Sequence, residues 1–175
     1  MRRIMIIGCC GAGKSTLARN LHKITGLPLI HLDQHYWRPN WTEAPDEEWE
    51  PIVEQLASGE DWIIDGNYNR TIDIRLERAD AIIYLDIPTW KCLYRVVTRI
   101  IKYHGQVRPD MPEGCRERFD LDFLHYVATF NMLKRKKILR RLDERKSTHS
   151  VFVIRNEVDL DKTLLSFKNE KLPKR

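Results

Sequence analysis

A short glycine-rich segment at residues 8–15 contains the residue types best suited to chemistry in this chain. It reads GCCGAGKS and follows an apolar run at residues 4–7. Glycines let the backbone turn tightly enough to aim several N–H groups at an anion, and a helix that starts here presents the positive end of its dipole. The lysine reaches the β- and γ-phosphates of a nucleotide, and the serine hydroxyl is a ligand for Mg²⁺. We therefore predict a P-loop that binds ATP and Mg²⁺ through Gly8, Gly11, Ala12, Gly13, Lys14, Ser15 and Thr16.

Five short apolar runs alternate with helical patterns and predict the frame that holds this loop. The runs cover residues 4–7, 29–32, 62–64, 82–85 and 151–154. Short continuous apolar runs are typical of parallel strands that are buried on both faces. The helical patterns cover residues 15–25, 45–58, 71–78, 89–103, 121–146 and 160–168. We expect one α/β domain over residues 1–175, with three α/β/α layers around a five-stranded parallel sheet.

Composition excludes several classes of protein. Of the 175 residues, 42% are hydrophobic and 31% are charged, which is ordinary for a globular chain. The sequence contains no apolar run long enough to cross a bilayer. We expect a cytoplasmic protein without a membrane partner. The cysteines at 9, 10, 92 and 115 lack the paired spacing of a zinc site or a disulfide framework.

Positive charge is concentrated in one part of the chain. The formal net charge is +5, but residues 90–146 alone hold 15 Lys or Arg against 7 Asp or Glu, which gives that segment +8. Such an asymmetry predicts an anionic partner. The partner is either the phosphates of a nucleotide or the backbone of a nucleic acid.

Three aspartates, Asp33, Asp65 and Asp86, each come directly after one of the apolar runs. The carboxyl ends of parallel strands lie at one edge of a sheet, and the P-loop lies at the same edge. A carboxylate there holds Mg²⁺ through water or polarises an attacking hydroxyl. We assign Asp65, together with Ser15, to the metal and Asp33 to the substrate. We expect Asp86 to cap the helix that follows it.

Arginines supply the fixed positive charge that phosphoryl transfer requires. Arg95 and Arg99 lie one helical turn apart, on one face of the helix predicted at 89–103. Residues 104–118 contain two glycines, two prolines and three arginines. This composition fits a mobile lid and an ordinary surface loop equally well. We assign catalytic roles to Lys14, Arg95, Arg99, Arg108 and Arg116.

Beyond the P-loop, three blocks carry a resemblance to a known family. They are LIHLDQHYW at 29–37, WIIDGNY at 62–68, and RPDMPEGC at 108–115. With these blocks the chain resembles the adenylate-kinase-like branch of P-loop kinases over residues 1–160. Within that branch it is most similar to the bacterial topology-modulation proteins of FlaR type. The resemblance implies a P-loop NTPase fold with a short lid at 104–118, and transfer of the γ-phosphoryl of Mg-ATP to a small acceptor, a nucleoside monophosphate.

The resemblance also implies positions for the ligands. It places Asp65 near Mg²⁺ and the acceptor, the arginines of helix and lid on the phosphates, and Arg155 and Asn156 against the base of the nucleotide. The acceptor would lie at about residues 33–58, where aromatic rings can stack on a base. The predicted acceptor residues are Asp33, Tyr36, Arg38, Asp65, Asn67 and Arg70.

Two alternatives fit the residues less well. Residues 156–159 have the outline of the guanine-reading box of GTPases, but Glu157 replaces its lysine and no DxxG motif occurs. His31, Asp33 and His35 have the spacing of metal ligands on a strand. A packed histidine beside a substrate-facing aspartate is the favoured interpretation.

A nucleotide-binding regulatory protein that contacts DNA is an alternative from another class. Residues 134–141 hold six positive side chains on one predicted helix, as an electrostatic DNA footprint would. The favoured interpretation is a solvated helix face with Leu133, Ile138, Leu139 and Leu142 turned inward.

Overall fold

A sheet of five parallel strands forms the centre of the fold in this computed structural model, which describes residues 1–169. The strands are β1 (Arg3–Gly8), β2 (Leu29–His31), β5 (Trp62–Asp65), β6 (Ala81–Leu85) and β7 (Ser150–Ile154), in the order β2-β5-β1-β6-β7. All four neighbouring pairs are parallel. The predicted five-stranded parallel sheet is therefore confirmed, and each strand agrees with its apolar run to within one residue at either end.

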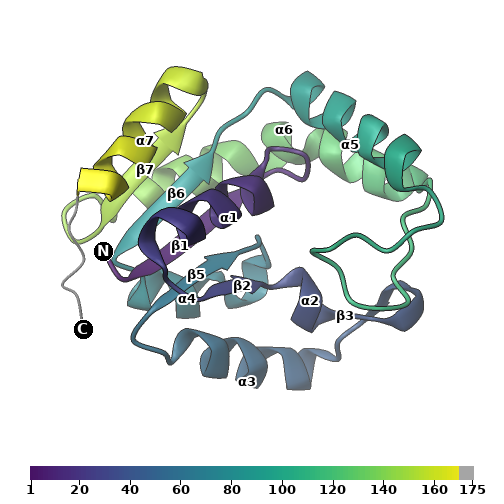
Figure 1. The fold of residues 1–175 in the computed structure, drawn as a ribbon, viewed down its shortest axis with the longest axis horizontal. Helices are drawn as coiled ribbons and strands as arrows, with labels where there is room; N and C mark the ends of the chain where they lie inside the picture. The colour runs from purple at the N-terminus through teal and green to yellow at the C-terminus, as the bar shows by residue number, and fades with distance from the viewer. Residues whose placement is uncertain (170–175) are drawn as a thin grey trace.

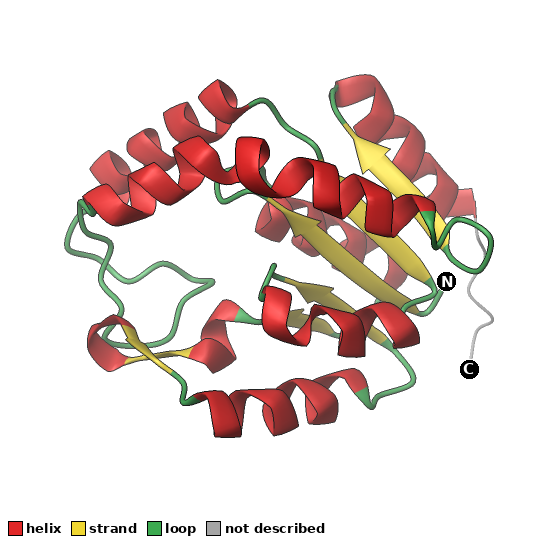
Figure 2. Ribbon diagram, turned by 180° about the vertical axis from the view of Figure 1, so that it is seen from behind, coloured by secondary structure: helices red, strands yellow, loops and turns green. Residues whose placement is uncertain are grey.

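Helices cover both faces of this sheet (Figure 1). They are α1 (Lys14–Thr25), α3 (Asp46–Ala57), α4 (Ile72–Arg78), α5 (Thr89–Tyr103), α6 (Leu121–Asp143) and α7 (Glu157–Asn169). α1 and α7 lie on one face, and α4 and α6 lie on the other, which Figure 2 shows from behind. The predicted three layers are thus present. α7 begins earlier than predicted because the Asn156 side chain accepts a hydrogen bond from the Asp159 backbone N–H at 2.9 Å and caps the helix.

Residues 33–43 form short elements that the sequence did not predict. α2 (Asp33–Tyr36) leads into a two-stranded antiparallel hairpin, β3 (Trp37–Arg38) and β4 (Thr42–Glu43). A 3₁₀ turn at Pro39–Trp41 joins the two strands, and a second 3₁₀ turn lies at Asn69–Thr71. Strands of two residues have no hydrophobic period, so no sequence pattern could reveal them.

The core lies within and around the central strands. Met5, Ile6, Ile63 and Ile82 have no exposed surface, which explains why their strands read as continuous apolar runs. On α6, Ile138 and Leu142 are buried as predicted, but Leu133 is 67% exposed, so its predicted inward orientation is wrong.

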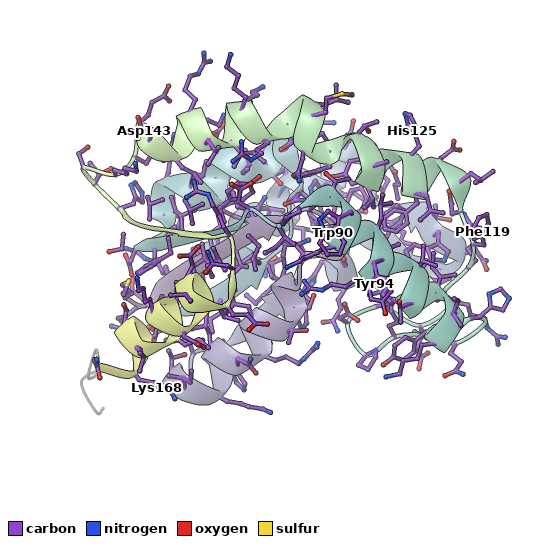
Figure 3. All side chains as sticks on the ribbon, turned by 90° about the horizontal axis from the view of Figure 1, so that it is seen from above. Trp90, Tyr94, Phe119, His125, Asp143 and Lys168 are labelled. Atoms are coloured by element: carbon purple, nitrogen blue, oxygen red, sulfur yellow. The ribbon has the colours of Figure 1, made fainter. Side chains whose placement is uncertain are left out.

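The outer side of α5 is apolar although it faces solvent. Trp90 and Tyr94 are 65% and 69% exposed, and they project from α5 in Figure 3. Cys92 and Val96 on the opposite side of the helix are fully buried. No helix within residues 1–169 is long and apolar enough to cross a membrane.

We expect Ile63→Ala to lower the free energy of unfolding by about 2–5 kcal/mol, because it leaves a cavity between the central strands. Denaturant titration measures this change. Ile101→Ala is the matched control: Ile101 is 74% exposed, so its truncation should change stability by less than about 0.5 kcal/mol. Equal losses in the two variants would contradict the burial described for β5.

Candidate functional site

The predicted P-loop forms the turn between β1 and α1. Lys14 is the first residue of α1, and its Nζ donates to the carbonyl oxygens of Gly8 at 3.0 Å and Cys9 at 3.2 Å. Ser15 follows in the first helical turn and is half-buried, whereas Thr16 is exposed. The Lys14 side chain therefore folds back onto the loop. The phosphates of a nucleotide would compete with these two carbonyl groups for its ammonium group.

α5 packs directly against the loop. A Cβ on Gly11 would lie 2.4 Å from the carbonyl oxygen of Cys92, and Gly11 has a φ of +79°, so only glycine fits there. Arg95 Nη1 donates to the carbonyl oxygen of Ala12 at 3.2 Å. The structure thus brings Arg95 to the P-loop, next to the predicted phosphate site.

Asn67, in the segment that follows β5, holds the start of the P-loop. Its Nδ2 donates to the Gly8 carbonyl at 2.8 Å, and its Oδ1 accepts from the Gly8 N–H at 3.0 Å. Asn67 also lines the cavity described below. The sequence predicts that Asn67 contacts the acceptor. Its two hydrogen bonds to Gly8 show that it also positions the P-loop.

A buried arginine of α4 holds the segment that contains Asn67. Arg75 is fully buried and donates to the carbonyl oxygens of Gly66 at 2.8 Å, Asn67 at 2.6 Å and Tyr68 at 3.3 Å. Burial lowers its pKa to about 9, so it remains protonated at neutral pH. Arg75 was not among the predicted site residues. The one feature of the sequence that indicates its burial is its position beside Ile72 and Leu76 on the apolar side of the helix.

Tyr68 connects this segment to Asp33. Its hydroxyl donates to Asp33 Oδ1 at 2.6 Å, and its φ of +36° is rare for an aromatic residue. Burial raises the pKa of Asp33, although the Tyr68 hydroxyl and the charge of Lys14 act in the opposite direction. Asp33 is therefore a carboxylate whose basicity depends on Tyr68.

Asp65 ends β5 and is 4% exposed. Its Oδ1 lies 2.6 Å from His31 Nδ1. Burial is the largest single effect and lowers the pKa of His31, but the hydrogen bond with Asp65 and the charges of Asp65 and Asp110 together raise it, and the net shift is upward. His31 is thus a packed histidine tied to a carboxylate. In the described part of the chain, no group of three or more His, Cys, Asp or Glu side chains could hold a metal ion by itself.

A cavity of about 570 Å³ opens between the P-loop, α2, the hairpin, the 104–118 segment and α6. This volume is in the range of small-molecule sites. It brings together Lys14, Asp33, Tyr36, Asn67, Arg99 and Arg108 from the predicted set. Its lining also includes residues that the sequence analysis did not assign: Glu43, Tyr68, Met111, Glu117, Arg118, Asp120, Phe123, Tyr126 and Lys134.

The 104–118 segment lies against the hairpin on one side of this cavity (Figure 1). Trp41 Nε1 donates to the Arg116 carbonyl at 2.8 Å, and the Asn40 N–H donates to the Gly114 carbonyl at 3.2 Å. A Cβ on Gly114, whose φ is +84°, would lie 2.9 Å from Pro39 Cβ. The segment is therefore docked on the hairpin at residues 114–116.

Two of the predicted arginines share one buried carboxylate. Glu117 is 4% exposed; its Oε1 lies 3.1 Å from Arg99 Nη2, and its Oε2 lies 2.6 Å from Arg108 Nε. Arg108 also contacts Asp110 at 3.0 Å. Both arginines line the cavity, but neither is an uncompensated charge.

Other predicted residues lie outside the cavity lining. Arg38 is paired with Glu48, and Arg70 with Asp46. Arg116 is exposed and touches the hairpin through its backbone carbonyl. These three side chains do not line the cavity. Arg38 and Arg70 bind acidic neighbours instead, and Arg116 is exposed to solvent.

Asp86 does not cap α5, contrary to the prediction. Its carboxylate receives two hydrogen bonds from Arg135, at 2.7 and 2.8 Å, and one from Arg155 at 3.2 Å. Pro88 stands at the start of α5 without a side-chain cap. Arg155 is thus engaged in an ion pair and Asn156 in capping α7, and neither lines the cavity.

Three of the six basic side chains at residues 134–141 of α6 are engaged within the protein, and Arg140 is 80% exposed. Arg135 binds Asp86, Arg141 lies 3.4 Å from Asp73, and Lys134 lies over the ring of Tyr126 at 4.6 Å. Lys136 and Lys137 are exposed. The region offers less surface charge to a nucleic acid than its sequence suggests.

Comparison with solved structures identifies the fold. Shikimate kinase from Acinetobacter baumannii, solved in complex with shikimate, is similar with a TM-score of 0.61 and 16% identity over 98% of this chain and 96% of that one. The chain has a P-loop NTPase fold. A sugar kinase from Janibacter sp. HTCC2649, solved without ligand, is similar with a TM-score of 0.50 and 17% identity over 95% of this chain and 94% of that one.

Sequence comparison adds no family. No protein-family model matches the chain, and no curated protein sequence matches it. The similarity to topology-modulation proteins therefore stays a prediction.

We expect Arg75→Leu to lower the free energy of unfolding by about 2–4 kcal/mol, because the buried carbonyl group of Gly66 and the partly buried one of Asn67 lose the donor that Arg75 supplies. Urea denaturation measures the change. Arg140→Leu is the control, since the Arg140 side chain is 80% exposed and its loss should be nearly neutral. Similar stability of the two variants would contradict the role assigned to Arg75.

Proposed function

We propose that the chain is a phosphotransferase that moves the γ-phosphoryl group of Mg-ATP to a small acceptor. One observation carries this proposal: Lys14 of the P-loop and Asp33 of α2 line the same cavity. A donor site and a carboxylate for the acceptor thus open into one cavity, as direct transfer requires.

The donor side rests on the P-loop. Its backbone N–H groups, Lys14 and the N-terminus of α1 would bind the phosphates. Ser15 and Asp65 together offer a hydroxyl and a carboxylate oxygen, and His31 occupies just one of the two Asp65 oxygens. These oxygen ligands would suit Mg²⁺, which prefers oxygen and would offset the negative charge of the phosphates.

The acceptor side rests on Asp33. A carboxylate with a raised pKa can accept the proton of an attacking hydroxyl near neutral pH more readily than an ordinary aspartate. Arg95 at the P-loop would offset the charge on the phosphoryl group in transit, whereas Arg99 and Arg108 in the cavity wall are paired with Glu117. The sequence predicts a nucleoside monophosphate as the acceptor, through the family resemblance.

We expect Lys14→Ala to reduce phosphoryl transfer about a hundredfold or more, because one fixed positive charge is removed from the phosphates. Coupled measurement of ADP release with the acceptor panel described below checks this. Lys136→Ala is the control, since Lys136 is exposed on α6 and lies outside the cavity lining. Unchanged turnover in a folded Lys14→Ala variant would contradict the proposal.

We expect Tyr68→Phe to move the acidic limb of the kcat/KM profile to higher pH. The Tyr68 hydroxyl lowers the pKa of Asp33, so its removal raises that pKa, and the active carboxylate then forms only at higher pH. Tyr36→Phe is the matched control, because the Tyr36 hydroxyl donates to Glu43 at 2.8 Å and not to Asp33. A limb at the same pH in wild type and Tyr68→Phe would show that Asp33 does not control the reaction.

A further inference from the structure

The cavity wall around Asp33 is acidic and aromatic. It is built from residues 33–43 and 66–69, and its charged members are Asp33 and Glu43. Within these two described segments, no lysine or arginine lines the cavity. An anionic group placed here would meet two carboxylates and no compensating cation from this wall.

The arginines that could have supplied such a cation are turned away. Arg38 lies in the hairpin and pairs with Glu48, and Arg70 follows the 66–69 segment and pairs with Asp46. Both side chains are about half exposed. They therefore bind acidic side chains at the surface, and they add no positive charge to the cavity wall around Asp33.

The three arginines of the opposite wall are already compensated by carboxylates, and Lys134 lies over the ring of Tyr126 at 4.6 Å. Glu117 serves Arg99 and Arg108, and Arg118 lies 3.6 Å from Asp120. A phosphate that recruited Arg99 or Arg108 would have to displace Glu117, which is buried and would lose its partners. Breaking such a buried pair is costly, because an uncompensated charge remains.

Aromatic rings complete the cavity wall around Asp33. Tyr36 and Trp37 pack edge to face with their centroids 5.1 Å apart, and Trp37 and Trp41 do so at 5.4 Å. Trp41 and Tyr68 both have a left-handed backbone, with φ of +61° and +36°, and such conformations cluster at binding sites. These rings offer flat apolar faces for a ring-shaped ligand.

On the basis of the function proposed above, we infer that the acceptor is an uncharged, ring-bearing hydroxyl compound, a nucleoside or a carbohydrate, and that its phosphorylated form is disfavoured. A hydroxyl of the acceptor donates to Asp33, and the rings of Trp37 and Trp41 contact its face. In the transfer the acceptor oxygen forms a bond to the γ-phosphorus, the bond from that phosphorus to the β,γ-bridging oxygen breaks, and the hydroxyl proton passes to Asp33. The products are ADP and a phosphate monoester. This acceptor differs from the monophosphate that the sequence predicts.

The test compares matched pairs of compounds on the full-length protein. One arm uses adenosine, guanosine, cytidine and uridine against their 5′-monophosphates, and the other uses glucose, mannose and ribose against their terminal phosphates. Binding is measured by calorimetry in the presence of Mg-ADP, and turnover by mass spectrometry of the product formed from Mg-ATP. In one of the two arms, we expect the uncharged member of each pair to bind about tenfold or more tightly than its phosphorylated partner. That arm shows whether the acceptor is a nucleoside or a carbohydrate.

The outcomes separate the inference from the proposed function. Preferential binding of uncharged members without any product would support the uncharged, ring-bearing ligand class and overturn the proposed transfer to it. Efficient phosphorylation of a nucleoside monophosphate would support the transfer and overturn the inference. Equal or tighter binding of the phosphorylated members in both arms, or no binding of any member, would also overturn the inference.

A variant tests the charge argument directly. We expect Glu117→Gln to shift the binding ratio toward the phosphorylated members by about fivefold or more, because Arg99 and Arg108 lose the charge that compensates them. Glu113→Gln is the matched control from the same segment, since Glu113 is exposed and does not line the cavity. An unchanged ratio in a folded Glu117→Gln variant would overturn the inference, and the wild-type pairs test it even if that variant does not fold.

Discussion

One buried guanidinium fixes the geometry on which the rest of the site depends. Arg75 binds three consecutive carbonyl groups after β5, and these residues then reach in two directions. Asn67 exchanges two hydrogen bonds with Gly8 of the P-loop, and Tyr68 binds Asp33. A flexible segment could not hold both contacts at once, because each requires a defined backbone direction. Donor loop and acceptor carboxylate are thus positioned by the same few residues.

The cations around the cavity differ in what holds them. Glu117 compensates Arg99 and Arg108 from within the protein, whereas Lys14 and Arg95 contact backbone carbonyls of the P-loop. A ligand anion displaces carbonyl contacts more easily than a buried carboxylate, because carbonyls carry no net charge. The two cations at the P-loop are therefore the ones most available to the phosphates of a nucleotide.

Much of the fold could be predicted from the sequence, because its signals are local. Continuous apolar runs such as the one around Ile63 mark the buried strands, and the spacing of glycines with Lys14 marks the P-loop. The pairing of charges could not be predicted. Glu48 lies ten residues from Arg38 and Asp86 lies 49 residues from Arg135, so nothing local shows which arginines are engaged. The hairpin was missed for another reason, since it depends on a left-handed backbone at Trp41 that tryptophan seldom adopts.

The close approach of Gly114 to Pro39 has a mechanical consequence. The 104–118 segment and the hairpin are joined there and by hydrogen bonds from Asn40 and Trp41. While these contacts hold, the two segments behave as one flap and cannot swing apart independently. A movement of the hairpin away from the cavity would therefore carry the 104–118 segment with it, and both sides of the cavity would open together.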